Sequence, residues 1–241
     1  MCGRFALDVT GEEIAAAFGI ESGSALDWTP RWNIAPTTCS PVIRGFEGKW
    51  RLDSLRWGLV PSWCDDASIG SRMINARSET VQTTSSYQGP FARTRCLVPI
   101  RGFYEWRRDV AGKAHPVAIL PDDGGLVTLA GLWTRNERIA EGGTLETFTI
   151  LTTAAGPNLE SVHDRMPVIL PAVDRDRWMD ERMTESGGPE SEELRAMLTR
   201  ASDCGLGTRR VSMRVNSSKH DGPSLLEPVD APLDESPGLF G

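Results

Sequence analysis

The sequence predicts an α+β fold in which a β-rich, barrel-like or two-sheet core is flanked by a few helices. Short stretches rich in Val, Ile, Leu, Thr and aromatic residues follow one another through the middle of the chain, separated by turn-forming residues. Helix-forming stretches are few and lie near the two ends. With 241 residues, 39% of them hydrophobic, the chain can bury a sizeable core.

The first elements are a short extended segment over residues 2–7 and then a helix. Thr10 and Glu13 have the spacing of a capping box, the run EEIAAAF favours helix, and Gly19 marks its end. Residues 21–41 are rich in Pro, Ser, Thr and Trp, which predicts a loop.

The β core is expected next, and two helices after it. Helices are predicted over 174–183 and over 190–199, where Leu194, Met197 and Leu198 fall on one apolar face. The predicted strands are 42–46, 50–60, 95–100, 103–107, 116–120, 126–134, 146–154 and 209–215. No repeat or composition break interrupts the chain, so we expect one domain over 2–230 and a flexible acidic tail over 231–241.

Composition excludes several classes of protein. The chain has no apolar run near the roughly 18 residues of a membrane span and no signal peptide, so we expect a cytoplasmic protein. The five cysteines are odd in number and lack C-x-x-C spacing, so neither a disulfide framework nor a metal site is expected. We expect no cofactor, and we interpret Cys39, Cys64, Cys96 and Cys204 as small buried residues.

The charge distribution permits DNA binding without predicting it. The net charge of -7 is unlike that of a general nucleic-acid binder. Residues 1–110 nevertheless carry 13 basic and 12 acidic residues, whereas residues 111–241 carry 13 and 21. A basic groove is therefore expected from the first half of the chain, with acidic surface elsewhere.

The N-terminal cysteine offers the most distinctive chemistry. An initiator Met is normally removed before a residue as small as Cys2, which leaves an α-amine and a thiol on adjacent carbons. An aldehyde can form an imine with this amine, and the thiol can then close a thiazolidine ring. Alternatively, the amine serves as base for its own thiol, as in N-terminal-nucleophile hydrolases. A cysteine at position 2 is by itself a weak signal.

Six segments together change the interpretation. They are MCGRF (1–5), RWNIAPTT (31–38), LRWGLVPSW (55–63), MINARSET (73–80), GFYEW (102–106) and SVHDRMPVIL (161–170). In this order they resemble the SOS-response-associated peptidase (SRAP) family over nearly the whole chain, with the resemblance fading after about residue 230. The resemblance implies a compact α+β fold that captures abasic sites in single-stranded DNA through a thiazolidine. The family name refers to a self-processing peptidase activity that exposes the cysteine.

The resemblance also implies a catalytic set of four residues. Cys2 resembles the family nucleophile, and Asn75 resembles the asparagine that hydrogen-bonds the adduct. Glu105 resembles the acid/base carboxylate, because burial among aromatic neighbours favours the protonated carboxyl that opening of the sugar ring requires. His163 resembles the second proton-transfer residue and follows a strand by a short loop.

DNA contacts are implied at further positions in the matching segments. Trp63 is predicted to stack on a base or to act as a wedge, although Cys64 replaces the second aromatic residue expected beside it. Ser85 or Ser86 replaces an expected basic residue. The remaining predicted contacts are Arg4, Arg77 and Arg165 for phosphates, Asn33 and Pro36 at the site entrance, and the Thr152 hydroxyl.

The leading hypothesis is thus a monomeric enzyme that crosslinks itself to abasic sites. Its expected partner is single-stranded DNA or a single-strand/double-strand junction, met at the nucleoid, with associated lyase and self-peptidase activity. One alternative is a cysteine-type peptidase or amidase that uses Cys2, Glu105 and His163. A second alternative is a non-catalytic module that binds single-stranded DNA, which would leave those residues unexplained.

Overall fold

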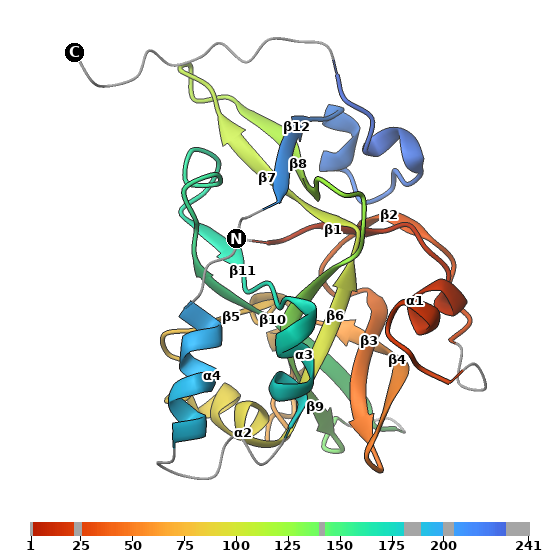
Figure 1. The fold of residues 1–241 in the computed structure, drawn as a ribbon, viewed down its shortest axis with the longest axis vertical. Helices are drawn as coiled ribbons and strands as arrows, with labels where there is room; N and C mark the ends of the chain where they lie inside the picture. The colour runs from red at the N-terminus through yellow and green to blue at the C-terminus, as the bar shows by residue number, and fades with distance from the viewer. Residues whose placement is uncertain (1, 22–25, 140–142, 181–188, 200–204, 230–241) are drawn as a thin grey trace.

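The computed structural model describes residues 2–21, 26–139, 143–180, 189–199 and 205–229. Its larger sheet is closed into a ring, because β10 pairs with both β4 and β9 and thereby joins the two ends of the order β10-β4-β3-β6-β9 (Figure 1). The ring strands are β3 (Cys39–Phe46), β4 (Lys49–Trp57), β6 (Arg95–Ile100), β9 (Val127–Asn136) and β10 (Leu145–Ala154). Ring closure leaves these strands without open edges.

A second sheet has the order β12-β8-β7-β1-β2 and lies above the ring in Figure 1. Its strand β1 pairs antiparallel with β2 on one side and with β7 on the other. The N-terminal residues therefore enter the fold between two strands of this sheet. Its strands are β1 (Phe5–Leu7), β2 (Arg31–Ile34), β7 (Gly102–Arg108), β8 (Ala114–Pro121) and β12 (Leu206–Arg210).

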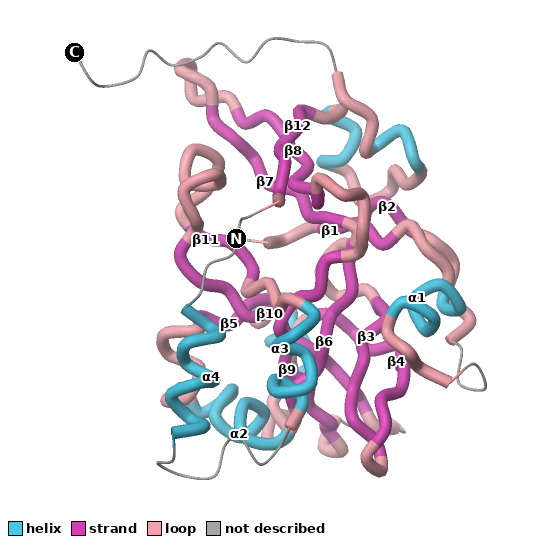
Figure 2. The backbone as a smooth tube through the Cα atoms, in the orientation of Figure 1, coloured by secondary structure: helices cyan, strands magenta, loops and turns pink. Residues whose placement is uncertain are grey.

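Two three-residue strands, β5 (Asn75–Arg77) and β11 (Arg165–Pro167), extend the ring at β10. Thr152 of β10 faces Arg77 in one and Pro167 in the other. Helices and 3-10 turns lie around the two sheets (Figure 2). They are α1 (Gly11–Ala17), η2 (Ala67–Arg72), α2 (Ser85–Arg93), α3 (Ala172–Met179), α4 (Pro189–Thr199), η4 (Met213–Asn216) and η5 (Pro223–Leu225).

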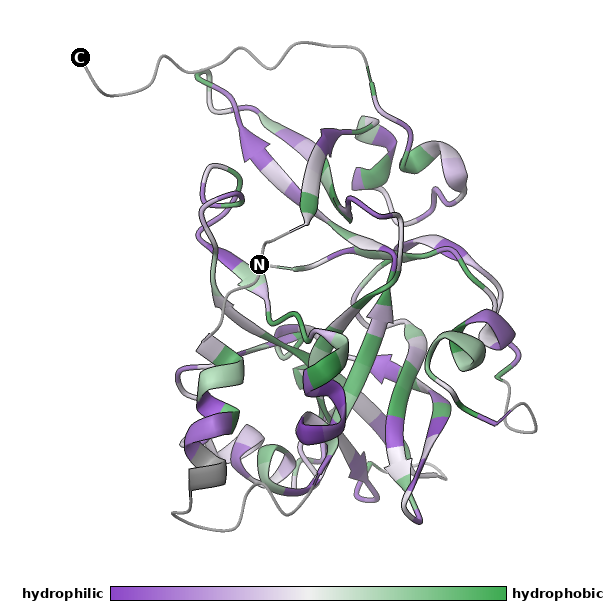
Figure 3. Ribbon diagram, viewed as in Figure 1, coloured by the Kyte–Doolittle hydropathy of each residue, from purple (hydrophilic) through white to green (hydrophobic). Residues whose placement is uncertain are grey.

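Aromatic residues link the two sheets at the centre of the molecule. Phe5 of β1 packs against Trp57 of β4, and Trp57 stacks on Phe148 of β10, with ring centroids 4.9 and 6.4 Å apart. All three side chains are fully buried. The hydrophobic residues of the ring strands show as green segments in Figure 3. Burial of such large side chains contributes about 1.5–3 kcal/mol each, which fixes β1 against the ring.

Most of the predicted elements are confirmed. The capping box is present, since Thr10 accepts a hydrogen bond from the Glu13 amide and Glu13 accepts one from the Thr10 amide. Gly19 has a positive φ of 65°, which suits the end of a helix. The seven predicted strands between residues 42 and 154 coincide with β3, β4, β6, β7, β8, β9 and β10. Helices α3 and α4 lie where two helices were predicted, and residues 181–183 are outside the described part.

Other predictions were wrong. The predicted loop over 21–41 contains β2 and the start of β3, because pairing with β1 makes RWNI a strand without an alternating pattern of its own. The predicted strand over 209–215 ends at β12 and turns into η4, where Ser212 caps a 3-10 helix. Helix α2 and strand β11 were not predicted, since Pro90 inside α2 and the brevity of β11 hide them.

Two further expectations concern cysteines and the chain end. Cys64 and Cys96 are buried as expected, but Cys39 is exposed at the first position of β3. Cys204 and the tail over 231–241 lie outside the described residues. Within the parts of the chain described here, no helix combines the length and apolar character needed to cross a membrane.

Candidate functional site

Cys2 is fully buried at the head of β1, between the second sheet and the ring. The pairing of β1 with β7 extends from Phe5, which lies opposite Phe103, toward Cys2. At the next position the Tyr104 amide donates a hydrogen bond of 2.9 Å to the Arg4 carbonyl. By this register Gly3 lies opposite Glu105. The sequence here still includes Met1, so the burial of Cys2 belongs to the chain before methionine removal.

Asn75 holds the backbone of Cys2 in place from the ring side. Its Nδ2 donates a hydrogen bond of 2.8 Å to the Cys2 carbonyl oxygen. Its Oδ1 is buried and accepts no hydrogen bond from any described residue. Strand β5 fixes the position of Asn75, since it pairs parallel to β10 with Asn75 beside Ile150. An open acceptor beside Cys2 costs free energy unless a ligand completes it.

Glu105 is buried in β7 and acts electrostatically on Cys2. Burial raises the pKa of the Cys2 thiol well above its usual range, and the negative charge of Glu105 raises it further. The thiol is therefore protonated in this form of the chain. The expectation that Glu105 lies in a buried setting is met: Phe103 and Tyr104 are also buried, and Trp106 is half-buried.

His163 lies just before β11, with two partners at one ring nitrogen. Its Nδ1 is 3.0 Å from the Arg165 amide nitrogen and 2.7 Å from Asp164 Oδ1. The amide N–H needs a lone pair on Nδ1, whereas the carboxylate needs a proton there. Nδ1 therefore accepts from the Arg165 amide when it carries no proton and donates to Asp164 when it carries one. Nδ1 has a partner with or without its proton, which suits a residue that passes protons.

Arg4 and Asn33 anchor a distant segment of the chain. Arg4 Nη1 donates to Asn33 Oδ1 and to the Val215 carbonyl, both at 2.8 Å. Asn33 is fully buried, and its Nδ2 lies within 3.3 Å of the carbonyls of Val215, Ser217 and His220. Burial lowers the pKa of the Arg4 guanidinium from its usual value. The predicted DNA contacts of both residues stay predictions, and both hold residues 213–220 against β1 and β2.

The side chains predicted to bind phosphate differ in their surroundings. The Arg77 side chain is exposed and forms no hydrogen bond or ion pair with a described residue. Arg165 forms a bidentate ion pair with Glu79, with N–O distances of 2.8 and 2.9 Å. Thr152 is fully buried between β5, which carries Arg77, and β11, which carries Arg165. Its backbone carbonyl accepts a hydrogen bond of 2.7 Å from Arg165 Nη2.

Trp63 is half exposed, at 52%, on a turn with firm anchors. The buried Asn136 donates to the carbonyls of Pro61 and Cys64, at 2.6 and 2.7 Å, on the two sides of Trp63. An exposed aromatic ring on a fixed turn is a suitable stacking platform. Pro36 is half-buried in the turn after β2, next to Thr37, whose φ of 68° is unusual for a β-branched residue.

Sequence reasoning missed three features beside the site. Glu79 lies in the quoted segment MINARSET but received no role. Tyr87 of α2 donates its hydroxyl to the Asn75 carbonyl at 3.3 Å, and burial raises the pKa of Tyr87 to about 12. Asn216 of η4 accepts a hydrogen bond of 2.7 Å from Nε1 of Trp106, the residue that follows Glu105 in the chain. Only Glu79 had a local signal, as an acidic residue two positions after Arg77.

Comparison with known proteins identifies the family of this chain. Residues 1–218 match the family described as SOS response associated peptidase (SRAP), and the chain belongs to this family. It is 35% identical over 228 residues to the abasic site processing protein YoqW of Bacillus subtilis (strain 168), covering 94% of this chain and 99% of that protein. It is 32% identical over 238 residues to the abasic site processing protein YedK of Escherichia coli (strain K12), covering 95% and 100%.

A solved structure supports the fold. A crystal structure of a protein from Bacteroides thetaiotaomicron superimposes with a TM-score of 0.80, covering 95% of this chain and 100% of that chain. The two sequences are 22% identical, so this likeness concerns the fold alone.

Proposed function

We propose that this protein captures abasic sites in single-stranded DNA by a covalent bond at Cys2. The observation that carries the proposal is the 2.8 Å hydrogen bond from Asn75 to the Cys2 carbonyl, in a site where Glu105 already acts on the Cys2 thiol. It is supported by the names of the relatives, which are described as abasic site processing proteins. Capture requires removal of Met1, which we propose occurs by self-processing.

The proposed reaction joins two atoms of Cys2 to one carbon of the sugar. The freed α-amine attacks the C1′ aldehyde of the opened abasic sugar, and water leaves as the imine forms. The thiol sulfur then adds to the imine carbon, and its proton moves to the nitrogen. The product is a five-membered thiazolidine ring, and one water is lost overall. A protonated thiol suits this order, because the amine attacks first.

Glu105 and His163 are proposed to move the protons. Opening of the sugar hemiacetal needs a proton at O4′ and a base for the hydroxyl proton, and Glu105 lies near enough to the Cys2 thiol to affect its pKa and to serve this role. His163, whose Nδ1 has a partner with or without its proton, is proposed to act in reversal and in the associated lyase step. The open Asn75 Oδ1 is proposed to accept a hydrogen bond from the captured sugar or the ring nitrogen.

Binding is proposed to depend on the DNA backbone and on stacking, without sequence preference. Arg4, Arg77 and Arg165 would contact phosphates, and Trp63 would stack on a base near the abasic residue. Asn33 and Pro36 would line the entrance, and Thr152 would line the site. A single-strand/double-strand junction is a proposed target as well, since an abasic residue has no base that must be unstacked.

The alternative is a cysteine-type peptidase or amidase. The sequence shows no peptide-binding signature for such an enzyme. The adjacent amine and thiol that removal of Met1 leaves at Cys2 are suited to an aldehyde, which favours the capture of abasic sites over peptidase action on other proteins.

The test is incubation with a single-stranded oligonucleotide that carries one abasic site. We expect a band that survives denaturing electrophoresis, with an intact mass equal to protein without Met1 plus DNA minus one water. Cys2→Ala should abolish it. Cys39→Ala is the matched control, because Cys39 is an exposed thiol without an adjacent amine. A stable adduct in Cys2→Ala, or a mass that places the bond elsewhere, would overturn the proposal.

A further inference from the structure

The Arg165–Glu79 pair occupies the place where a phosphate would be expected. Both terminal nitrogens of Arg165 face the two carboxylate oxygens of Glu79, at 2.8 and 2.9 Å. This is the fork geometry that guanidinium groups use for carboxylate and phosphate alike. The ion pair with Arg165 holds the pKa of Glu79 below its usual range, so Glu79 is charged.

Two of the three remaining N–H donors of Arg165 point into the protein. Nη2 also donates to the Thr152 carbonyl at 2.7 Å, and the Nε–H is buried without a hydrogen bond to any described residue. The Arg165 side chain is only 15% exposed, whereas that of Glu79 is 48% exposed. A guanidinium has five N–H donors, and its end fork is already taken. A phosphate can therefore reach that fork only if the Glu79 carboxylate moves out.

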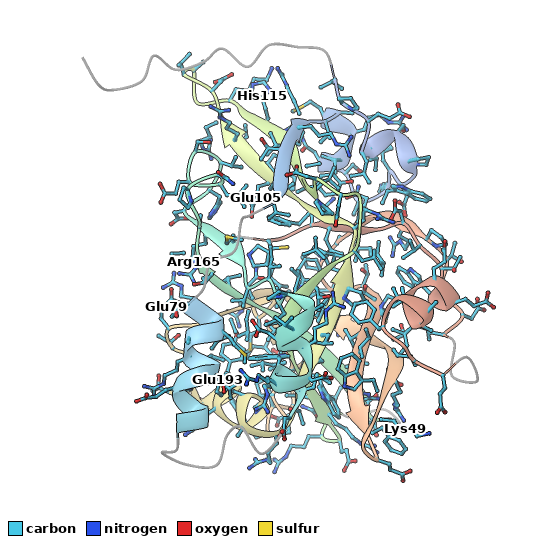
Figure 4. The ribbon with its side chains drawn as sticks, viewed as in Figure 1. Lys49, Glu79, Glu105, His115, Arg165 and Glu193 are labelled. Atoms are coloured by element: carbon cyan, nitrogen blue, oxygen red, sulfur yellow. The ribbon has the colours of Figure 1, made fainter. Side chains whose placement is uncertain are left out.

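The pair lies next to the proposed reaction site. Figure 4 shows Arg165 and Glu79 together below Glu105, on the same side of the molecule. Glu79 follows strand β5, whose first residue Asn75 bonds to Cys2. Thr152, which holds Arg165, also accepts from the Ser78 amide at 2.9 Å. Because the strands on both sides are fixed, the exposed Glu79 side chain is the part free to rotate.

We infer that the Glu79 carboxylate competes with a DNA phosphate for the two terminal nitrogens of Arg165. In the absence of DNA it neutralises the guanidinium and keeps it extended along β10. When single-stranded DNA binds, a phosphate replaces the Glu79 carboxylate at the terminal nitrogens of Arg165, and the carboxylate rotates into the solvent. This inference rests on the proposed function, since it assigns Arg165 to the DNA backbone.

This competition would make the protein select DNA with an abasic site over undamaged DNA. A neutral pair attracts ordinary DNA less than a free arginine does, so noncovalent binding to undamaged strands is weakened. At an abasic site the covalent bond at Cys2 compensates for this lost affinity. Arg77, exposed and without an ion-pair partner among the described residues, gives the initial contact with the backbone.

The test is the equilibrium affinity of Glu79→Gln for a single strand that contains tetrahydrofuran, an abasic analogue without an aldehyde. The substitution keeps the size of the side chain and removes its charge. We expect binding to tighten by about fivefold, the effect of a favourable ion pair at the protein surface. Permanent positioning of Arg165 by Glu79 predicts the opposite, a weaker complex, and that result would overturn the inference.

A charge-matched control separates competition from a general effect of net charge. Glu21→Gln removes an exposed carboxylate that pairs with Lys49 at 2.8 Å, and Figure 4 shows Lys49 on the opposite side of the view from Glu79. We expect its affinity to equal that of the unchanged protein. In an Arg165→Gln background, the gain from Glu79→Gln should disappear. An equal gain in that background, or with Glu21→Gln, would also contradict the inference.

Covalent capture distinguishes this inference from the proposed function. If the unchanged protein fails to form an adduct with abasic DNA, the proposed function fails, whatever the affinities are. If it forms the adduct and Glu79→Gln binds no more tightly, only the role of Glu79 fails. Unfolding midpoints of the variants check that each one is folded.

Discussion

The side-chain amide of Asn75 donates a 2.8 Å hydrogen bond to the backbone carbonyl of Cys2, and these two residues come from different sheets. Cys2 precedes β1 in the second sheet, whereas Asn75 begins β5 beside the ring. The hydrogen bond therefore fixes the chain end across the junction of the two sheets. It acts on the backbone of Cys2 and leaves both reactive groups of that residue outside the bond.

Asn75→Ala should slow capture of abasic DNA by roughly two- to tenfold, since the net free energy of a hydrogen bond is about 0.5–1.5 kcal/mol. Single-turnover rates of adduct formation measure this. Tyr87→Phe is the control, because it removes only the bond to the Asn75 backbone and keeps the amide. Equal rates for Asn75→Ala and the unchanged protein would show that the bond has no role in capture.

Glu105→Gln should slow capture by about 10²–10⁴-fold, the usual contribution of a positioned acid or base. The variant keeps the shape of the buried side chain, so unfolding should remain cooperative. The measurement is the rate of adduct formation across a pH series. A variant as fast as the unchanged protein at every pH would remove Glu105 from the proton transfers.

The same variant should change the Cys2 thiol. The Glu105 charge raises the pKa of this thiol by disfavouring the thiolate, so its removal lowers the pKa. Alkylation of Cys2 at a fixed pH below its pKa should then be faster, as followed by mass spectrometry of the N-terminal peptide. Cys96 is the internal control, because burial is the main cause of its raised thiol pKa and Glu105 does not contribute. Unchanged alkylation of Cys2 would mean that the two groups do not interact.

Trp63→Ala should weaken binding to single-stranded DNA by about 1–3 kcal/mol, the contribution of one stacked base, and should leave stability nearly unchanged. Phe46→Ala is a matched control, because Phe46 is equally exposed at 52% but lies on the β3–β4 hairpin. Fluorescence anisotropy of a labelled oligonucleotide measures both. Equal losses for the two variants would refute a specific stacking role for Trp63.

Asn33→Ala should destabilise the protein by about 1–3 kcal/mol, since it removes the side-chain donor to the His220 carbonyl and one acceptor of the half-buried Arg4 guanidinium. Denaturant unfolding gives this value directly. Thr10→Ala, which removes a helix cap, should cost about 1 kcal/mol and serves as a reference. If Asn33→Ala instead keeps full stability and loses DNA affinity, the predicted DNA contact is its main role.

Local signals explain which elements could be predicted. The capping box at Thr10 and Glu13 lies within four residues, so the sequence reveals it directly. The long strands β9 and β10 carry enough β-branched and apolar residues to stand out. Strands β2, β5 and β11 have three or four residues each, and their form depends on partners far away in the chain. Such pairings leave no periodic pattern in the sequence.

The same distinction applies to the site. Cys2, Asn75, Glu105 and His163 were predicted from resemblance to the SRAP family, and the contact between Asn75 and Cys2 appears only in the fold. Glu79 was invisible as a partner of Arg165 because 86 residues separate them in the chain. Asn33 and Arg4 were predicted as DNA contacts, yet their bonds to residues near Val215 depend on how the C-terminal segment packs.

By itself, the amino-acid sequence determined the chemical groups available, the family, the long strands of the core and the helix after Thr10. The tertiary structure alone decided that β10 closes a ring, that Cys2 is buried between two sheets, and that Glu79 takes the fork of Arg165. The physical reason is the distance along the chain over which each interaction acts. Propensity and capping act over a few neighbouring residues, whereas ring closure, burial and ion pairing join residues that only packing of the whole chain brings together.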